Sequence, residues 1–551
     1  MKYSRFSSSS NYALSKRLLS QLRKINDDDV YFIVLYSFFY KYASDILKDY
    51  FLSVIEDKEL TLDEAYRTPK YQVLFKEDAL KMFGYYIEKP EAFIDEIINN
   101  KQDDNYFFLD FFNIFPSNVT FSKGSNYEKY FNLIFNLLKE KVNYNSEKNS
   151  ILKEIILYIS KLNTEEDEVS FSDVFGEVSK SISKRSNLTP DYINDIFYAL
   201  LSVEKSNFEN IYVPFLGNGS SILNMPPIFG FFNVYGKEKD QLTFFAALVG
   251  FFINYFDLDS VFLENSDVKD SVEMDYTSFD VILSKVSRGN RILTDTLKKE
   301  NIQNTKRNKR MELEDVLNSN FNMDLNSLSK DLEFNDALES LVDKMELDVQ
   351  SEFFGEYESL KDSEFLFLIN LLNTLKRDGT MLISISQNFL LKNSLTTLRK
   401  YLTYENNYID TIISIPSGHV RSVYPQIILV FKKDKFDDNI LFIDLSKNIS
   451  NKKSLNRYSK AGNSLLDDDD LAELVDVYLN KKTIDKFSNL VSMEEIEKNN
   501  FNLSISRYVD TYEGEFVKLE DLKQEKIDID KKMSILNKKI KDMLDDLEIN
   551  H

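Results

Sequence analysis

The spacing of apolar residues divides the chain into a helical first part and a mixed second part. From Tyr12 to about Leu152, apolar residues recur three and four positions apart, which predicts amphipathic helices and few strands. Examples are Leu18, Leu19 and Leu22, and then Val34, Leu35, Phe38, Phe39 and Tyr42. We therefore expect a helical N-terminal domain over residues 1–150.

After Glu204 the pattern changes to short β-rich runs that alternate with helical stretches, which predicts a parallel sheet. The runs are 211–213, 231–235, 260–263, 279–283, 380–385, 408–415, 426–431 and 440–444, with a helical pattern over 365–375. Seven or eight such strands fit an α/β, Rossmann-like domain over residues 151–450. Only residues 416–425 separate two of the last strands, so we expect an antiparallel hairpin at the sheet edge.

Three further segments have their own patterns. Residues 288–361 form a polar insertion with weak helical periodicity, and its basic residues Lys306, Arg307, Lys309 and Arg310 could meet phosphate, although a solvated loop is the favoured interpretation. Residues 451–515 are a C-terminal extension. Over 516–551, apolar residues three and four apart predict a coiled-coil helix or, equally, a helix docked on its own chain. They are Leu519, Leu522, Ile529, Met533, Leu536, Ile540, Met543 and Leu547.

Composition excludes several kinds of chemistry. With no Cys, the chain can have no disulfide or thiolate nucleophile, and with only His419 and His551 we expect no metal site. The most apolar stretch, 242–256, is shorter than the roughly 20 residues of a membrane-spanning helix, so we expect a cytoplasmic protein without membrane association. The net charge of −22 opposes extensive binding to naked DNA, so a partner is expected to share any DNA recognition.

A glycine-containing segment, Val213-Pro214-Phe215-Leu216-Gly217-Asn218-Gly219-Ser220-Ser221, follows the first of these strands. Its two glycines would let the backbone approach a ligand closely. The next strand ends in Tyr235-Gly236-Lys237-Glu238, where nucleoside-binding folds place a carboxylate that accepts hydrogen bonds from ribose. Upstream, Asn187-Leu188-Thr189-Pro190 precedes a helix that begins near Asp191, and helix capping explains that segment equally well.

These segments resemble the modification subunits of type I restriction–modification systems, which are adenine-N6 DNA methyltransferases. That family has, in this order, a Phe/Tyr-Thr-Pro element, an Asp-Pro-x-x-Gly-Ser/Thr-Gly loop, a Tyr-Gly-x-Glu strand end and an Asn-Pro-Pro-Phe motif. The most specific similarity is Phe501-Asn502-Leu503-Ser504-Ile505-Ser506-Arg507-Tyr508-Val509-Asp510, and residues 35–45, 415–418 and 424–430 add to it. Only the insertion lacks a counterpart.

The resemblance implies a Rossmann-like S-adenosylmethionine-dependent methyltransferase core between the N-terminal helical domain and the C-terminal helix. It also implies a binding site for S-adenosylmethionine. The residues that it assigns to this cofactor are Asn187, Leu188, Thr189, Pro190, Gly217, Asn218, Gly219, Ser220, Glu238 and Asp267. The implied partners are a specificity subunit, a restriction subunit and double-stranded DNA held through the complex.

Two departures from the family pattern change the expected activity. Val213 stands where the family has an acidic residue and Leu188 replaces an aromatic one, so we expect cofactor binding to be weakened or lost. Ser284-Lys285-Val286-Ser287 replaces Asn-Pro-Pro-Phe, whose Asn and following carbonyl accept hydrogen bonds from the target amino group while the aromatic ring stacks on the flipped base. Because one lost preorganised hydrogen bond can cost roughly 10²–10³ in rate, we expect a degenerate catalytic motif.

Three functions remain open from the sequence. The favoured one is a catalytically impaired, modification-like subunit that retains the family's fold and assembly role. The second is an active adenine-N6 DNA methyltransferase in which Ser284 is the acceptor, Gly217 and Gly219 lie beneath the cofactor and Glu238 binds the ribose. The third is an interaction scaffold unrelated to DNA. A specificity subunit that copurifies with the chain would separate the first from the third.

Overall fold

The computed structural model describes residues 11–22, 27–56, 60–101, 106–141, 149–164, 169–183, 192–205, 207–254, 257–266, 279–285, 368, 371–372, 374–415, 426–445, 466, 468–510 and 519–548. Several predicted features lie outside these ranges: the segment 187–190, Asp267, Val286, Ser287 and the insertion 288–361. The predicted domain boundaries stay a prediction.

The first part of the chain is helical, as the apolar spacing predicts, and α2 (Asp28–Val54) is its central helix. The side chain of Asp27 accepts a hydrogen bond from the backbone N–H of Asp29 and caps the helix. Every residue from 30 to 45 is buried, because α7, α8 and α12 all pack against α2. The other helices of this part are α1 (Asn11–Leu22), α3 (Leu62–Arg67), α4 (Pro69–Met82), α5 (Ile94–Lys101), α6 (Phe107–Ser117), α7 (Asn126–Lys141), α8 (Asn149–Ser160) and α9 (Phe171–Ser183).

This helical part also contains a small hairpin that the sequence analysis missed. Strand β1 (Tyr85–Ile87) pairs antiparallel with β2 (Val119–Phe121). Strands of three residues are too short to show the alternation of apolar and polar residues by which strands are predicted.

A mixed nine-stranded sheet occupies the middle of the described chain, in the order β11-β10-β8-β9-β7-β6-β3-β4-β5. Among these strands only β9 and β11 run antiparallel to their neighbours. The strands are β3 (Asn210–Val213), β4 (Asn233–Lys237), β5 (Val261–Glu264), β6 (Phe279–Lys285), β7 (Leu375–Ser386), β8 (Ile409–Ile415), β9 (Gln426–Lys432), β10 (Ile440–Asp444) and β11 (Ser488–Val491). All eight predicted strands are confirmed; β11 was missed.

The predicted antiparallel hairpin exists, but its predicted place at the sheet edge is wrong. Strands β8 and β9 pair antiparallel, yet β9 lies between β7 and β8, and β10 and β11 continue the sheet beyond β8. Both faces of β8 carry buried apolar side chains, as in a strand with neighbours on both sides. The short connection predicts that the two strands pair antiparallel. It does not predict between which strands of the sheet the second one lies.

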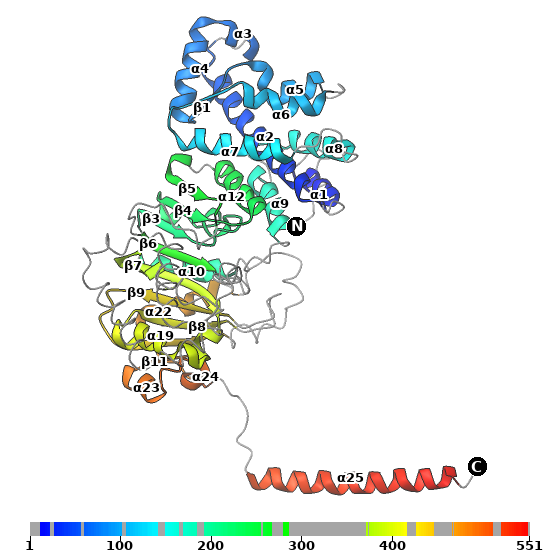
Figure 1. Ribbon diagram of the computed structural model, residues 1–551, viewed down its shortest axis with the longest axis vertical. Helices are drawn as coiled ribbons and strands as arrows, with labels where there is room; N and C mark the ends of the chain where they lie inside the picture. The colour runs from blue at the N-terminus through cyan, green and yellow to red at the C-terminus, as the bar shows by residue number, and fades with distance from the viewer. Residues whose placement is uncertain are drawn as a thin grey trace, which may run out of the picture.

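Helices cover both faces of the sheet and create two apolar layers (Figure 1). On one face lie α10 (Tyr192–Glu204), α11 (Ser220–Leu223), α12 (Gln241–Ile253) and α22 (Asp468–Asn480), in an apolar core that continues into the N-terminal helices. On the other lie α18 (Asn388–Leu391), α19 (Thr396–Lys400), α23 (Met493–Lys498) and α24 (Ile505–Tyr508). We call these the α10 face and the α24 face. Val281 and Leu283 of β6 point to the α10 face, and Ile282 points to the α24 face.

The N-terminal helices protect the outer edge of the sheet. The hydroxyl of Tyr130, on α7, donates to the carbonyl of Val261 and accepts from the backbone N–H of Leu263, both at 2.7 Å. The side-chain amide of Asn126 donates to the same Val261 carbonyl at 3.1 Å. These contacts satisfy backbone groups of β5 that an edge strand would otherwise leave unpaired.

The stretch 501–510, the most specific family similarity, is held by a buried arginine. Arg399 is 1% exposed and donates to the carbonyl oxygens of Phe501, Phe389 and Lys392 at 2.6, 3.0 and 2.7 Å. Tyr508 packs on Phe442 of β10, with ring centres 4.4 Å apart. This stretch therefore closes the α24 face of the sheet.

The last helix, α25 (Leu519–Glu548), is drawn apart from the sheet in Figure 1. Its side chains Ile527, Ile529, Met533, Ile535 and Leu536 are 47–60% exposed. The predicted helix is confirmed. The interpretation that it docks on its own chain does not hold for these residues.

Candidate functional site

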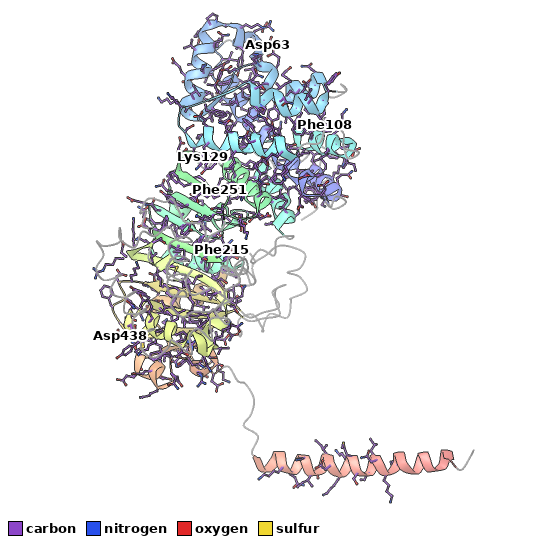
Figure 2. All side chains as sticks on the ribbon, viewed as in Figure 1. Asp63, Phe108, Lys129, Phe215, Phe251 and Asp438 are labelled. Carbon is purple, nitrogen blue, oxygen red and sulfur yellow. The ribbon has the colours of Figure 1, made fainter. Side chains whose placement is uncertain are left out.

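The glycine loop follows β3 at the carboxyl edge of the parallel strands. Gly217 and Gly219 adopt φ angles of 59° and 80°, a region that favours glycine. A Cβ on Gly219 would lie 3.2 Å from a ring carbon of Phe251 and 3.3 Å from the side chain of Leu223. Figure 2 marks Phe251, on α12, and Phe215, within the loop. The loop therefore turns tightly into α11. At its two glycines the loop consists of backbone atoms alone.

Three side chains from three different elements hold the glycine loop. The carboxylate of Glu238, after β4, accepts from the backbone N–H of Gly217 at 2.9 Å. The amide of Asn218 donates to the hydroxyl of Ser179 on α9 at 3.0 Å. The hydroxyl of Tyr198 on α10 donates to the carbonyl of Ser221 at 3.0 Å. The loop is therefore preorganised by the protein itself.

Glu238 is the acidic residue of this site. Its second oxygen accepts from the backbone N–H of Asp240 at 2.8 Å, so both carboxylate oxygens accept from the backbone. Burial raises the pKa of Glu238, and the backbone donors of Asp240, Gly217 and Lys239 oppose that rise. Beside it, the fully buried Lys237 pairs with Glu264 of β5 at 3.3 Å.

The predicted catalytic position lies at the end of β6, next to β3. Ser284 is 0% exposed, and its hydroxyl has no hydrogen-bond partner within the described ranges of the chain. By the alternation of β6, Ser284 points to the α24 face and Lys285 to the α10 face. Ser284 and Lys285 pair with Ile383 and Ser384 of β7, and Ser384 lies 3.4 Å from the amide oxygen of Gln426.

The structure brings together the described residues that the sequence pointed to. Gly217, Asn218, Gly219, Ser220 and Glu238 meet at the ends of β3 and β4, and Ser284 and Lys285 end the neighbouring β6. The sequence analysis missed Ser179, Tyr198 and Asn194, which stand on the buried faces of α9 and α10. A polar residue within an apolar helical stripe is the signal by which they could have been found.

The described residues contain no group of three or more His, Cys, Asp or Glu side chains that could hold a metal ion. Within the same ranges, no helix combines the length and apolar character needed to cross a membrane.

Solved structures with the same architecture define the class of this fold. A type I restriction–modification methyltransferase subunit from Streptococcus thermophilus superposes with a TM-score of 0.67 at 21% identity, over 92% of this chain and 100% of that one. A modification subunit of a putative type I restriction enzyme from Vibrio vulnificus superposes with a TM-score of 0.50 at 12% identity, over 90% and 94% of the two chains. The fold is that of the methyltransferase subunits of type I restriction–modification systems.

Sequence comparisons also find similarity to DNA methylases and to type I restriction enzymes. The family model for N-6 DNA methylases matches residues 334–515. The methylase subunit of the type I restriction enzyme MpnII from Mycoplasma pneumoniae is 23% identical over 94% of this chain and 92% of its own length. That of MjaVII from Methanocaldococcus jannaschii is 31% identical over 26% of this chain and 24% of its own length. The resemblance to type I modification subunits is thereby confirmed.

Proposed function

We propose that this chain is a modification-like subunit of a type I restriction–modification system that binds S-adenosylmethionine but transfers its methyl group poorly or not at all. The observation that carries the proposal is the contrast between the two halves of the site. The glycine loop and Glu238 are ordered for a nucleoside ligand, whereas the catalytic position holds a buried Ser284.

The residues present fit S-adenosylmethionine at its nucleoside end. Gly217 and Gly219 let the backbone approach the ligand, and the carboxylate of Glu238, at the end of β4, is the acceptor for the ribose hydroxyls. Val213, 1% exposed, packs into the apolar core and cannot offer the carboxylate that the family places there. We therefore expect binding that is weaker than in relatives with the acidic residue.

When bound, S-adenosylmethionine supplies a methyl group on a positively charged sulfur. The protein must then hold the target amino group and stabilise the positive charge that develops on its nitrogen. Ser284 offers one short side-chain acceptor, which is fully buried in the structure. Val286 and Ser287 bring no aromatic ring, and Lys285, which points to the opposite face of the sheet from Ser284, supplies no acceptor.

Calorimetric titration with S-adenosylmethionine tests the first half of the proposal. We expect binding by the wild-type protein, and its loss in Glu238→Ala. Glu494→Ala, which removes an exposed carboxylate from α23, is the matched control and should bind normally. Absence of binding by the wild-type protein at millimolar ligand would overturn the proposed cofactor site and leave a scaffold.

Methyl transfer to DNA, measured with a radioactive methyl donor in the assembled complex, tests the second half. We expect little or no transfer by the wild-type chain. The variant Ser284→Asn, Lys285→Pro, Val286→Pro and Ser287→Phe, which restores the family motif, should transfer more. Rapid transfer by the wild-type chain would favour the alternative of an active adenine-N6 DNA methyltransferase.

The exposed apolar side chains of α25 support a role in assembly. Ile529, Met533 and Leu536 form a stripe three and four residues apart that can form a coiled coil with a partner helix. We assign this stripe to a specificity subunit, which would read double-stranded DNA in the cytoplasm beside a restriction subunit. With a net charge of −22, the chain needs such a partner to approach DNA.

A further inference from the structure

Asn194 is a buried polar residue whose side chain is unsatisfied. It is 2% exposed, and among the residues that the structure describes neither its amide nitrogen nor its amide oxygen has a hydrogen-bond partner. Ile193, Ile196 and Phe197 around it on α10 are buried apolar side chains. An amide in such surroundings destabilises the folded protein unless something hydrogen-bonds to it.

The position of Asn194 on α10 links it to the glycine loop. Residues four apart share one face of a helix, so Asn194 lies beside Tyr198, whose hydroxyl donates to the Ser221 carbonyl at 3.0 Å. The other end of α10 lies near the starts of the strands, because Lys205 pairs with Asp280 of β6 at 3.4 Å. Asn194 is therefore near the carboxyl ends of the strands, on the α10 face.

The direction of the bound ligand identifies the part that Asn194 would meet. Glu238 fixes the ribose at the end of β4, and β3, with its glycine loop, lies between β4 and β6. A ligand that is held at β4 and extends across the loop toward β6 on the α10 face brings its far end toward the first turns of α10. In S-adenosylmethionine that far end is an α-amino acid, with one ammonium and one carboxylate.

We propose that Asn194 binds the α-amino acid end of S-adenosylmethionine, a role that rests on the proposed cofactor site. The amide oxygen accepts from the ammonium group and the amide nitrogen donates to the carboxylate, which satisfies both orphaned atoms at once. The Asn194 amide stays unsatisfied until the ligand binds, and this lowers the stability of the ligand-free protein.

Two neutral ligands that share one nucleoside isolate this contact. S-adenosylhomocysteine carries the amino acid end, and 5′-methylthioadenosine has a methyl group in its place. In Asn194→Leu, which is similar in shape but has no polar atoms, calorimetry should show at least about tenfold weaker binding of S-adenosylhomocysteine and less than about twofold change for 5′-methylthioadenosine. Asn194→Asp, which removes the donor and repels the carboxylate, should show the same selectivity.

The melting temperature of the ligand-free protein is the second readout. Asn194→Leu should raise it by roughly 1–2 °C, because an unsatisfied amide is replaced by an apolar group. A fall in the melting temperature would show that Asn194 has a protein partner and would overturn the proposal. So would unchanged binding of S-adenosylhomocysteine, or equal weakening of both ligands.

The wild-type protein separates this failure from that of the proposed function. If it binds neither ligand, the cofactor site itself is absent and both proposals are overturned. If it binds both ligands and the Asn194 variants do so equally well, only the role of Asn194 is overturned.

Discussion

The backbone N–H of Gly217 donates to the carboxylate of Glu238 at 2.9 Å, which joins the glycine loop of β3 to the end of β4. The same carboxylate also accepts from the N–H of Asp240 at 2.8 Å. Glu238 therefore positions the loop, and it is also the group that we propose for the ribose. A substitution at this position tests both.

Glu238→Gln should weaken both adenosine ligands. The amide group has only one acceptor oxygen, so its NH₂ faces a backbone donor such as the N–H of Gly217 or Asp240. We expect roughly 10–100-fold weaker binding of S-adenosylhomocysteine and of 5′-methylthioadenosine, the loss typical of one hydrogen bond to a charged group. Calorimetry measures it. A loss confined to S-adenosylhomocysteine would contradict ribose binding by Glu238.

Arg399→Ala should strongly destabilise the sheet domain. The guanidinium satisfies the carbonyl oxygens of Phe501, Phe389 and Lys392, and its removal leaves them unpaired in the interior beside a cavity. We expect a loss of about 3–5 kcal/mol in the free energy of unfolding. Urea unfolding followed by circular dichroism measures it.

The matched control for this variant is Arg507→Ala, an exposed arginine within the same 501–510 stretch. It should change the free energy of unfolding by less than about 0.5 kcal/mol. Equal effects of the two variants would mean that the stretch is held by something other than Arg399.

Tyr130→Phe should loosen the outer edge of the sheet. It removes only the hydroxyl that donates to the Val261 carbonyl and accepts from the Leu263 N–H. Because these backbone groups are buried, we expect a loss of about 1–3 kcal/mol, with faster hydrogen exchange at Leu263. Tyr106→Phe, at a side chain that is 65% exposed, should have neither effect. Unchanged exchange at Leu263 would argue against the edge contact.

Lys435 should make the free energy of unfolding depend on pH in the alkaline range. Burial lowers the pKa of Lys435 to about 8, although its ammonium donates to Asn407 and to the Ile409 carbonyl at 3.0 and 3.1 Å. Between about pH 8 and the ordinary value of 10.5, the unfolded chain binds a proton that the folded chain has released. The free energy of unfolding therefore rises with pH through that window, and as the pH falls the loss of stability is complete at about pH 8.

The urea midpoint of the wild-type protein, taken relative to that of Lys435→Met at each pH, measures this dependence. The difference should shift in favour of the wild-type protein between about pH 8 and 10.5. A difference that stays constant with pH would show that Lys435 titrates alike in the folded and unfolded chains.

Met533→Lys with Leu536→Lys should separate assembly from folding. Both side chains are exposed on α25, at 57% and 60%, so the melting temperature should be unchanged. Association with the specificity subunit, followed by size-exclusion chromatography, should be lost because the substitutions place two charges in the apolar stripe. If the double variant still associates with the specificity subunit, the partner surface does not lie on α25.

The periodicity of the apolar residues and the order of the motifs predicted most of the architecture. The strands from 211 to 444 and the terminal helix could be predicted because each carries a regular pattern of apolar side chains, and such patterns are local in sequence. The hairpin of β1 and β2 escaped prediction because strands of three residues carry too little pattern. Strand β11 was missed because two of its four residues, Ser488 and Asn489, are polar.

The sequence alone determined the kinds of residue that could act: a glycine loop, one carboxylate at Glu238 and an altered motif at Ser284. The tertiary structure alone decided that β9 inserts between β7 and β8 and that Tyr198 and Ser179 hold the loop. It also decided that Asn194 is buried with no hydrogen-bond partner in the part of the chain that the structure describes. Strand order and the satisfaction of a buried amide depend on groups far apart in the chain, and their meeting is fixed only when the whole core packs.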